Sequence, residues 1–365
     1  MNALNVLMGR WGSLLSATIL ACLAGWGGVR AVAADRPVGP VPVCVSTPDL
    51  EGLVREVGGA RVDVMSFSAG PEDPHEIELK PGLAVALDRA ELFVQVGLGL
   101  ENAWLERLMR RVRNEAVKPG GPGNLNAGVG VEALEGGEGA PVPGSFHEDG
   151  NPHYLLDPLE GLRVAAAIRD RLTALRPAWA AEFRERHEAF RQRIAVAWVG
   201  EKCAREDDLE TLVREFAGLG TVAEAEAFRA RHGLEGWLGR LVPFRGRKVV
   251  GDHDLWPYFA RRCGIEVLVY LEPSPGVPPS TRHLRRVVTE MQRDGVGLIL
   301  SAPYFEARHA RFVAGRTGAR ILPMAHQTGG RPGTETYEAM LRHNFEQLLG
   351  GLGGLGGADP GGPSR

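Results

Sequence analysis

The regular alternation of short apolar runs with helical patterns constrains the fold more than any other feature of this sequence. In the first third of the chain, strands are predicted at Val41–Val45, Val62–Met65 and Glu91–Val96. Helical patterns at 49–57 and 81–89 separate them, and Pro81 opens the second helix, where its missing N–H removes no helical hydrogen bond. This alternation is typical of a parallel sheet covered by helices on both faces.

The same alternation returns in the last third of the chain, after a charged, helical stretch at about 206–238. The predicted strands are Lys248–Gly251, Glu266–Leu271, Val296–Leu300 and Ala319–Leu322, and the predicted helices are 255–263, 281–293, 305–317 and 335–349. A second parallel sheet with its own helices is therefore expected.

The segment between the two alternating regions is helical over about 177–205. Its large apolar residues recur at helical spacing, with charged residues on the other faces: Trp179, Phe183, Phe190, Ile194 and Trp198. A single helix of that length would extend roughly 40 Å. Before it, 101–113 is predicted as a helix and the Gly- and Pro-rich stretch 118–150 as a long mobile loop.

These patterns predict an α/β protein whose two lobes, each a parallel sheet flanked by helices, are joined by one long linking helix. Five parts are expected along the chain: a signal peptide at 1–34, an N-terminal lobe at 35–175, the linking helix at 176–205, a C-terminal lobe at 206–350 and a disordered Gly-rich tail at 351–365.

Residues 1–34 have the pattern of a cleaved signal peptide. Arg10 precedes an apolar run, Trp11–Ala24, which is shorter than the roughly 20 residues needed to span a bilayer. The small residues of Ala31–Ala34 suit signal peptidase, so we expect an exported, periplasmic protein. An uncleaved membrane anchor and lipidation at Cys22 remain alternatives, ranked below cleavage.

Charge and cysteine content exclude other classes. The chain has 42 Lys and Arg against 45 Asp and Glu, a formal net charge of −3, so no large basic excess indicates nucleic-acid binding. The part of the chain after the predicted signal peptide contains three cysteines, Cys44, Cys203 and Cys263. Their spacing is not that of a zinc finger or of a redox pair. A Cys203–Cys263 disulfide remains open at this stage.

Three histidines stand where strands of an open α/β sheet present ligands. His75 lies in the loop after the 62–65 strand, and His253 follows the 248–251 strand. His153 comes from the other end of the Gly-rich loop, and both His75 and His153 directly follow a proline, which stiffens the backbone. Imidazoles that converge on one point favour a borderline transition metal, zinc above all.

The sequence resembles the periplasmic zinc/manganese solute-binding proteins of ABC importers over about 41–349. Five motifs carry the resemblance in order: Asp73–Glu78, Asn151–His153 with Asp157-Pro158, His253–Phe259, Glu272–Pro275 and Thr317–Ala319. The resemblance implies two α/β lobes, a linking helix and one metal ion between the lobes. It also implies that His75, His153 and His253 are ligands.

The resemblance leaves the fourth ligand open. Family members usually carry an Asp in the loop after the strand that follows Thr-Gly-Ala, and His326 stands close to that place here. Glu272 is the alternative carboxylate. Glu78 and Asp157 are expected to accept hydrogen bonds from imidazole N–H groups, although Asp157 is equally suited to cap the helix after Pro158.

The loop before the second motif also departs from many zinc-specific relatives, which carry several His and Asp there. Its one histidine, His147, is expected to be exposed to solvent rather than to bind the metal. The loop is therefore not expected to collect metal.

We therefore expect a non-enzymatic carrier that captures zinc, with manganese less favoured, and delivers it to an ABC permease with its ATPase. A monomer that binds no nucleic acid is expected. One alternative is an exported zinc hydrolase with Glu76 or Glu272 as general base, although no compact ligand motif such as His-Glu-x-x-His occurs. A periplasmic metallochaperone or adhesin is the other alternative.

Overall fold

A computed structural model describes residues 39–134, 150–206, 208–273 and 277–355. The predictions for the signal peptide, Cys22 and His147, and for residues 356–365 of the tail, lie outside these residues. From Pro40 onward the chain forms one compact unit.

The first sheet contains four parallel strands in the order β2-β1-β3-β4. Its strands are β1 (Val41–Val45), β2 (Val62–Ser66), β3 (Leu92–Gln95) and β4 (Asn124–Asn126). The central strands β1 and β3 are nearly all apolar because helices cover both their faces. The short polar strand β4 at the edge was not predicted and lies in the stretch expected to be a loop.

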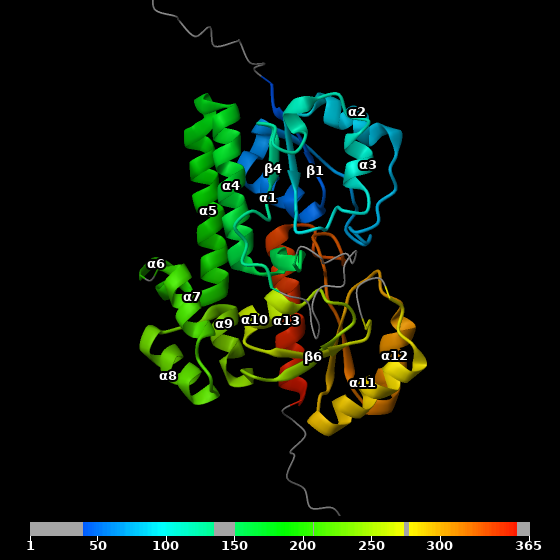
Figure 1. Ribbon diagram of the computed structural model, residues 1–365. Coiled ribbons are helices and arrows are strands. Elements are labelled where there is room, and N and C mark those ends of the chain that lie inside the picture. Colours follow the sequence, from blue (N-terminus) through cyan, green and yellow to red (C-terminus); the bar gives the residue numbers. More distant parts are fainter. Residues whose placement is uncertain (1–38, 135–149, 207, 274–276, 356–365) are drawn as a thin grey trace, which may run out of the picture. The chain divides into compact units, whose positions relative to one another are not determined.

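Helices pack on both faces of this sheet (Figure 1). On one face, α2 (Pro81–Arg89) and α3 (Leu105–Met109) enclose an apolar cluster with Phe67, Phe93 and Trp104. On the other face, α1 (Pro48–Gly58) packs against the long helices α4 (Pro158–Leu175) and α5 (Ala180–Val199).

Helix α3 is shorter than the predicted helix at 101–113, since the residues on either side of it form turns. After the helix, Asp88 accepts hydrogen bonds from the N–H groups of Arg113 and Asn114. The N–H of Arg113 is therefore not available to a helical carbonyl oxygen.

The predicted linking helix is interrupted. A 3-10 turn, Pro177–Trp179, precedes α5, and Gly200 at φ 88° ends it, so its 20 residues extend about 30 Å. The following short helices are α6 (Glu201–Glu206), α7 (Leu209–Ala217), α8 (Val222–His232) and α9 (Gly236–Leu241). They confirm the helical character predicted for 206–238.

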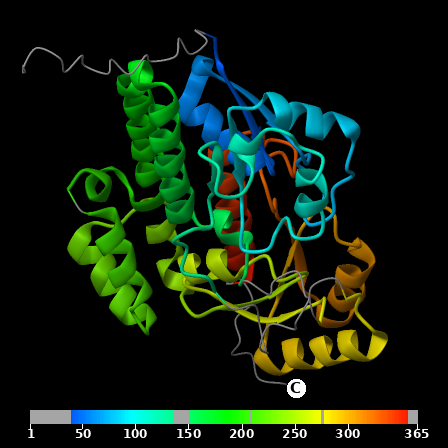
Figure 2. The ribbon, with the colours of Figure 1, turned by 45° about the horizontal axis from the view of Figure 1, so that its top comes forward.

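The second sheet repeats the topology of the first, with four parallel strands in the order β6-β5-β7-β8. Its strands are β5 (Lys248–Gly251), β6 (Glu266–Tyr270), β7 (Leu298–Ser301) and β8 (Arg320–Pro323). Helices α11 (Thr281–Asp294) and α12 (Ala307–Thr317) share one apolar cluster with the sheet, and α10 (Pro257–Cys263) packs into the other. Figure 2 shows α11 and α12 in yellow and orange, side by side.

The last helix, α13 (Tyr337–Leu355), contacts both lobes. It packs against β8 and α9 of the second lobe and against α1 of the first. The hydroxyl group of Tyr337 donates a hydrogen bond to the carbonyl oxygen of Leu155 (2.6 Å). Residues 351–355 are helical, so the prediction that the disordered tail begins at 351 was wrong; the buried Leu352 continues the apolar stripe of the helix.

Together these elements confirm the predicted fold class of two lobes with parallel sheets flanked by helices. Cys44, Cys203 and Cys263 are each a buried thiol and not half of a disulfide, so the possible Cys203–Cys263 bond is not formed. In the part of the chain that the structure describes, no helix has both the length and the apolar character needed to cross a bilayer.

Candidate metal centre

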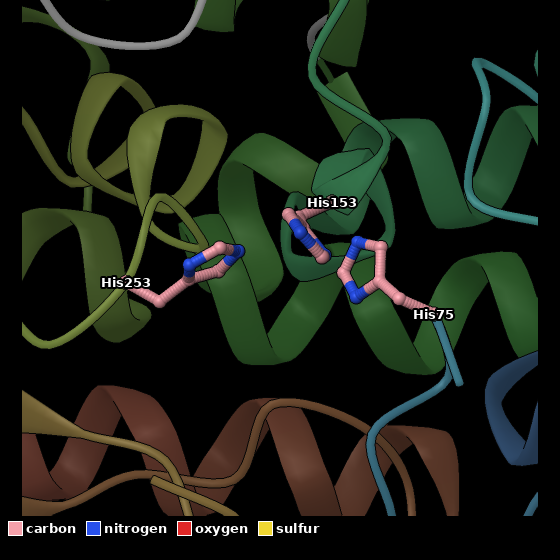
Figure 3. A group of neighbouring side chains, drawn as sticks. All are labelled: His75, His153 and His253. Atoms are coloured by element: carbon pink, nitrogen blue, oxygen red, sulfur yellow. The ribbon is translucent and has the colours of Figure 1, made fainter. Parts of the chain in front are cut away.

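Three histidines from distant parts of the chain meet at the carboxyl ends of the strands. The nitrogen atoms that His75, His153 and His253 can offer to a metal lie within 4.8 Å of one another. Their ring centroids are 5.1 to 5.9 Å apart, and Figure 3 shows the three rings turned toward one point. Exposed fractions of 3, 8 and 4% show that the rings are buried.

The Asp-Pro-His sequence positions the first imidazole. The Asp73 carboxylate accepts hydrogen bonds from the backbone N–H of His75 (2.9 Å) and from its ring Nδ1 (2.8 Å). The second contact leaves Nε2 of His75 for the common centre. Burial raises the pKa of Asp73, but the contacts with His75 outweigh it and hold that pKa below its ordinary value.

The Asn-Pro-His sequence holds the backbone of the second histidine as Asp-Pro-His holds that of the first. The side-chain oxygen of Asn151 accepts a hydrogen bond from the backbone N–H of His153 (2.9 Å). The Asn151 amide donates to the carbonyl oxygen of Asp254 (2.7 Å), and the Tyr258 hydroxyl donates to the carbonyl oxygen of Asn151 (2.9 Å). Residues of the second lobe thus hold the segment that carries His153.

The third histidine contacts two carboxylates, one through its ring and one through its backbone N–H. Glu272 contacts Nδ1 of His253, which directs Nε2 toward the other two rings. Asp252 accepts a hydrogen bond from the backbone N–H of His253 (2.9 Å) and another from Nε1 of Trp256 (3.2 Å). Burial raises the pKa of Asp252 to about 6.

His326, the predicted fourth ligand, lies outside the group of three. Its Nε2 donates a hydrogen bond to the carbonyl oxygen of Glu72 (2.9 Å), and its ring packs on that of Tyr304 at 4.7 Å. Burial lowers its pKa to about 4, so the ring is neutral at pH 7. The next residue, Gln327, donates to the carbonyl oxygens of Ala69, Gly70 and Glu72. This loop therefore holds the segment before His75 and supplies no atom to the group.

The structure gives the other predicted residues different contacts. Glu272 contacts the His253 ring. Glu78 is exposed and lies 3.8 Å from Lys80. Asp157 is fully buried; it caps α4 through the N–H of Leu159 (2.9 Å) and pairs with Arg262 (2.6 Å). The contacts of Asp157 thus support its helix-capping interpretation, and the expected hydrogen bonds from imidazoles to Glu78 and Asp157 stay predictions.

Sequence reasoning missed Asp73 and Asn151 as positioning residues. The signal was present, because in both motifs an Asp or Asn stands two residues before the histidine, with a proline between. Such side chains often bond the backbone two residues further on. The hydrogen bond between the His75 ring nitrogen and Asp73 is evident only in the three-dimensional structure.

Three imidazoles, two of them held by carboxylates, are a donor set suited to a divalent metal. Nitrogen donors favour zinc, copper, nickel and iron over the oxygen-preferring magnesium, calcium and manganese. The Asp73 and Glu272 carboxylates would offset the charge of a bound dication.

Comparison with known proteins gives a consistent picture. A family model described as zinc-uptake complex component A, periplasmic, matches residues 43–202 and 238–351. The unmatched residues between the two segments include α7 and α8.

Individual relatives are distant. The high-affinity zinc uptake system protein ZnuA of Brucella abortus is 23% identical over 199 residues, which are 54% of this chain and 48% of that protein. The chain thus spans about half the length of these first relatives. The manganese-binding lipoprotein MntA of Halalkalibacterium halodurans is 22% identical over 340 residues, 92% of this chain and 96% of that protein. A crystal structure of ZnuA superposes with a TM-score of 0.62 at 22% identity, covering 86% of this chain and 99% of that one, which shows the shared fold.

Proposed function

The chain belongs to the family of the periplasmic zinc-uptake complex component A, and we propose that it is an extracytoplasmic solute-binding protein that captures zinc between its lobes. It delivers the metal to an ABC-type permease, which works with its own ATPase. Manganese is the less favoured cargo.

The convergence of His75, His153 and His253 carries this proposal. The three residues come from distant segments of the chain. The rings of His75 and His253 contact carboxylates, and Asn151 accepts a hydrogen bond from the backbone N–H of His153. Metal-binding histidines usually donate their other ring nitrogen to a carboxylate, a backbone carbonyl or water.

Zinc is favoured over manganese because the group offers three nitrogens, while manganese prefers oxygen ligands. The nearest carboxylates, Asp73 and Glu272, are each engaged by a histidine ring nitrogen. The relatives include both zinc- and manganese-binding proteins, so the choice depends on this donor set.

The remaining parts of the proposal concern the whole protein. Residues 1–34 direct export to the periplasm and are cleaved. The lobes comprise about 35–175 and 206–350, with the linking segment between them, and the protein acts as a monomer. The hydrolase alternative has lost its support, since the family and its relatives are uptake proteins and not enzymes.

A competition titration of the metal-stripped protein tests the proposal. With a fluorescent chelator, we expect one equivalent of zinc to bind at least 100-fold more tightly than manganese. His253→Ala should weaken zinc binding by at least 100-fold. His343→Ala, which alters a histidine of α13 outside the group, should leave it unchanged.

Two results would refute it. If zinc binds only weakly, the protein is not a zinc carrier. If His253→Ala and His343→Ala bind zinc equally tightly, the metal lies elsewhere.

A further inference from the structure

The helices on one side of the second sheet carry an unusual concentration of positive charge. Residues 277–323 contain eight arginines and three carboxylates, a formal net charge of +5. The whole chain has a net charge of −3, so the rest of it carries −8. Charge asymmetry of this size within one chain indicates an interaction with a surface of opposite sign.

The arginines of α11 and α12 lie opposite the buried sides of these helices. On α11 the buried residues are Leu284, Val287, Val288 and Met291, which pack toward the sheet. On α12 they are Ala310 and Val313. The arginines of the two helices, and Arg320 at the start of β8, are all exposed, and we call them together the basic face: Arg282, Arg285, Arg286, Arg293, Arg308, Arg311, Arg316 and Arg320.

The two helices form one continuous surface. They lie side by side, as Figures 1 and 2 show, and their buried side chains belong to the same apolar cluster with the sheet. The side chain of Gln292 on α11 donates a hydrogen bond to the carbonyl oxygen of Arg316 on α12 (3.1 Å). The 14 residues of α11 alone extend the face over about 20 Å.

The three carboxylates neutralise only part of this charge. Asp294 pairs with Arg293 and with Lys248, Glu290 lies 3.6 Å from Arg286, and Glu306 pairs with Arg308. The other five arginines form no ion pair within 4.0 Å among the described residues: Arg282, Arg285, Arg311, Arg316 and Arg320.

The composition of the face favours a phosphate-bearing partner over a protein. Protein interfaces are usually centred on large apolar or aromatic anchors. None of the large hydrophobic residues exposed in the described part of the chain stands on α11 or α12; the nearest in sequence, Val277, precedes α11. An arginine guanidinium, in contrast, binds phosphate oxygens through two parallel hydrogen bonds without any apolar anchor.

We propose that the basic face binds the anionic phospholipid surface of a membrane. The arginines are spread over two helices and do not converge on one point, which suits a layer of headgroups better than one small anion. The contact is peripheral and electrostatic. His253 stands at the carboxyl end of β5, and the arginines of the basic face belong to α11, α12 and the start of β8.

This inference rests on the proposed function in one respect. A protein that delivers metal to a permease works beside a membrane. Its test is independent of metal. The probe is a mixed vesicle with phosphatidylglycerol as the minor lipid and phosphatidylcholine as the major one. It is compared with a vesicle of pure phosphatidylcholine in a sedimentation assay at low salt.

Two matched variants, each with four arginines replaced, locate the contact. The first carries Arg282→Gln, Arg285→Gln, Arg286→Gln and Arg311→Gln. The control carries Arg184→Gln, Arg205→Gln, Arg214→Gln and Arg229→Gln, four exposed arginines of α5 to α8. Both lose the same charge, and thermal unfolding verifies that both remain folded.

We expect the unaltered protein to bind the anionic vesicles at least 10-fold more tightly than the neutral ones, and less tightly as salt rises. The first variant should lose roughly 100-fold in affinity, because each arginine near an anionic surface contributes several-fold. The control should retain at least half of the binding. Equal binding to both kinds of vesicle, or equal loss in both variants, would overturn the proposal. Tighter binding to duplex DNA than to vesicles, lost in the first variant, would also overturn it.

Discussion

At the scale of single residues, the structure depends on charges placed where water cannot reach them. The fully buried carboxylate of Asp157 is paired with Arg262, whose guanidinium also lies 5.3 Å from the ring centroid of Trp198. This pair joins α10 to the beginning of α4, and so joins the two lobes. A buried ion pair adds little net stability, but either charge alone is strongly unfavourable.

Arg262→Met should therefore lower the free energy of unfolding by about 3–5 kcal/mol. The double variant Asp157→Asn with Arg262→Met should regain much of this loss, since Asn keeps the helix cap and carries no charge. Urea denaturation measures both. A double variant as unstable as Arg262→Met would show that the loss comes from packing on Trp198.

Glu272 and Asp73 test whether positioning of the imidazoles matters for metal affinity. Glu272→Gln removes the negative charge beside Nδ1 of His253, and we expect zinc affinity to fall by about 10- to 100-fold. Asp73→Asn should act similarly on His75. The exposed Glu78 supplies the control, because Glu78→Gln should have no effect. If Glu272→Gln retains full affinity by chelator competition, the carboxylate has no such role.

The buried carboxyl group of Asp49 should make the free energy of unfolding depend on pH. Burial raises its pKa to about 6, although hydrogen bonds from Thr328 oppose this rise. In the unfolded chain Asp titrates near pH 3.9, so between about pH 4 and 6 the folded protein binds more protons. The contribution of this group to stability is therefore lost as the pH rises through that window.

Asp49→Asn removes this titration. The stability of the variant relative to the unaltered protein should rise between pH 4 and pH 7, by an amount on the order of 2 kcal/mol. Asp170→Asn, at an exposed site on α4, is the control. A difference that stays constant over this pH range would contradict the assignment.

The residue types in short motifs predicted which histidines form the site, but the sequence did not predict which atoms each side chain contacts. The sequence singled out His75, His153 and His253, and the structure places their rings together. It could not show that His326 turns toward the carbonyl oxygen of Glu72, because that contact joins residues more than 250 positions apart.

At the scale of elements, the main correction concerns the linking helix. Periodicity continued through Gly200, so the sequence predicted one uninterrupted helix over about 177–205. The helix ends at Gly200 because its backbone, at φ 88° and ψ 163°, leaves the helical region. A Cβ at this position would also lie 2.7 Å from that of Glu235.

Gly200→Ala should consequently destabilise the protein by roughly 1–3 kcal/mol, because this backbone conformation is almost restricted to glycine. Gly353→Ala, in the helical part of α13 with no atom near the added methyl group, should have the opposite sign and stabilise by up to about 1 kcal/mol. Thermal unfolding compares the two. Equal effects would show that the conformation of Gly200 is not strained by a side chain.

Strands and helices of strong pattern were predicted within a few residues, whereas weak or polar elements were not. The apolar strands β1 and β5 match their predictions, since burial on both faces requires continuous apolar residues. The polar edge strand β4 was not predicted, because the residues of Asn124–Asn126 are typical of a loop. Its pairing with β3 is visible only in the structure.

At the scale of the whole molecule, binding and stability are linked. A metal held by His75 and His153 from one lobe and His253 from the other binds only when both lobes are folded. Such a ligand stabilises the folded state by mass action.

Zinc at about 100 times its dissociation constant should therefore raise the free energy of unfolding by about 2.7 kcal/mol, and the melting temperature with it. A chelator should reverse the shift. His253→Ala, which binds zinc at least 100-fold more weakly, should shift by no more than about 0.4 kcal/mol at the same zinc concentration. A shift of equal size in that variant would mean that zinc acts elsewhere on the protein.

The hydrogen bonds between lobes have a consequence for unloading. Gln327 and Tyr258, both from the second lobe, hold the segments that carry His75 and His153, and these bonds need no metal. Because these segments are already ordered, binding of the ion has to order few residues, which favours fast capture. Under the proposed function, release of the ion would then depend on separating these contacts between the lobes, a step that falls to the permease.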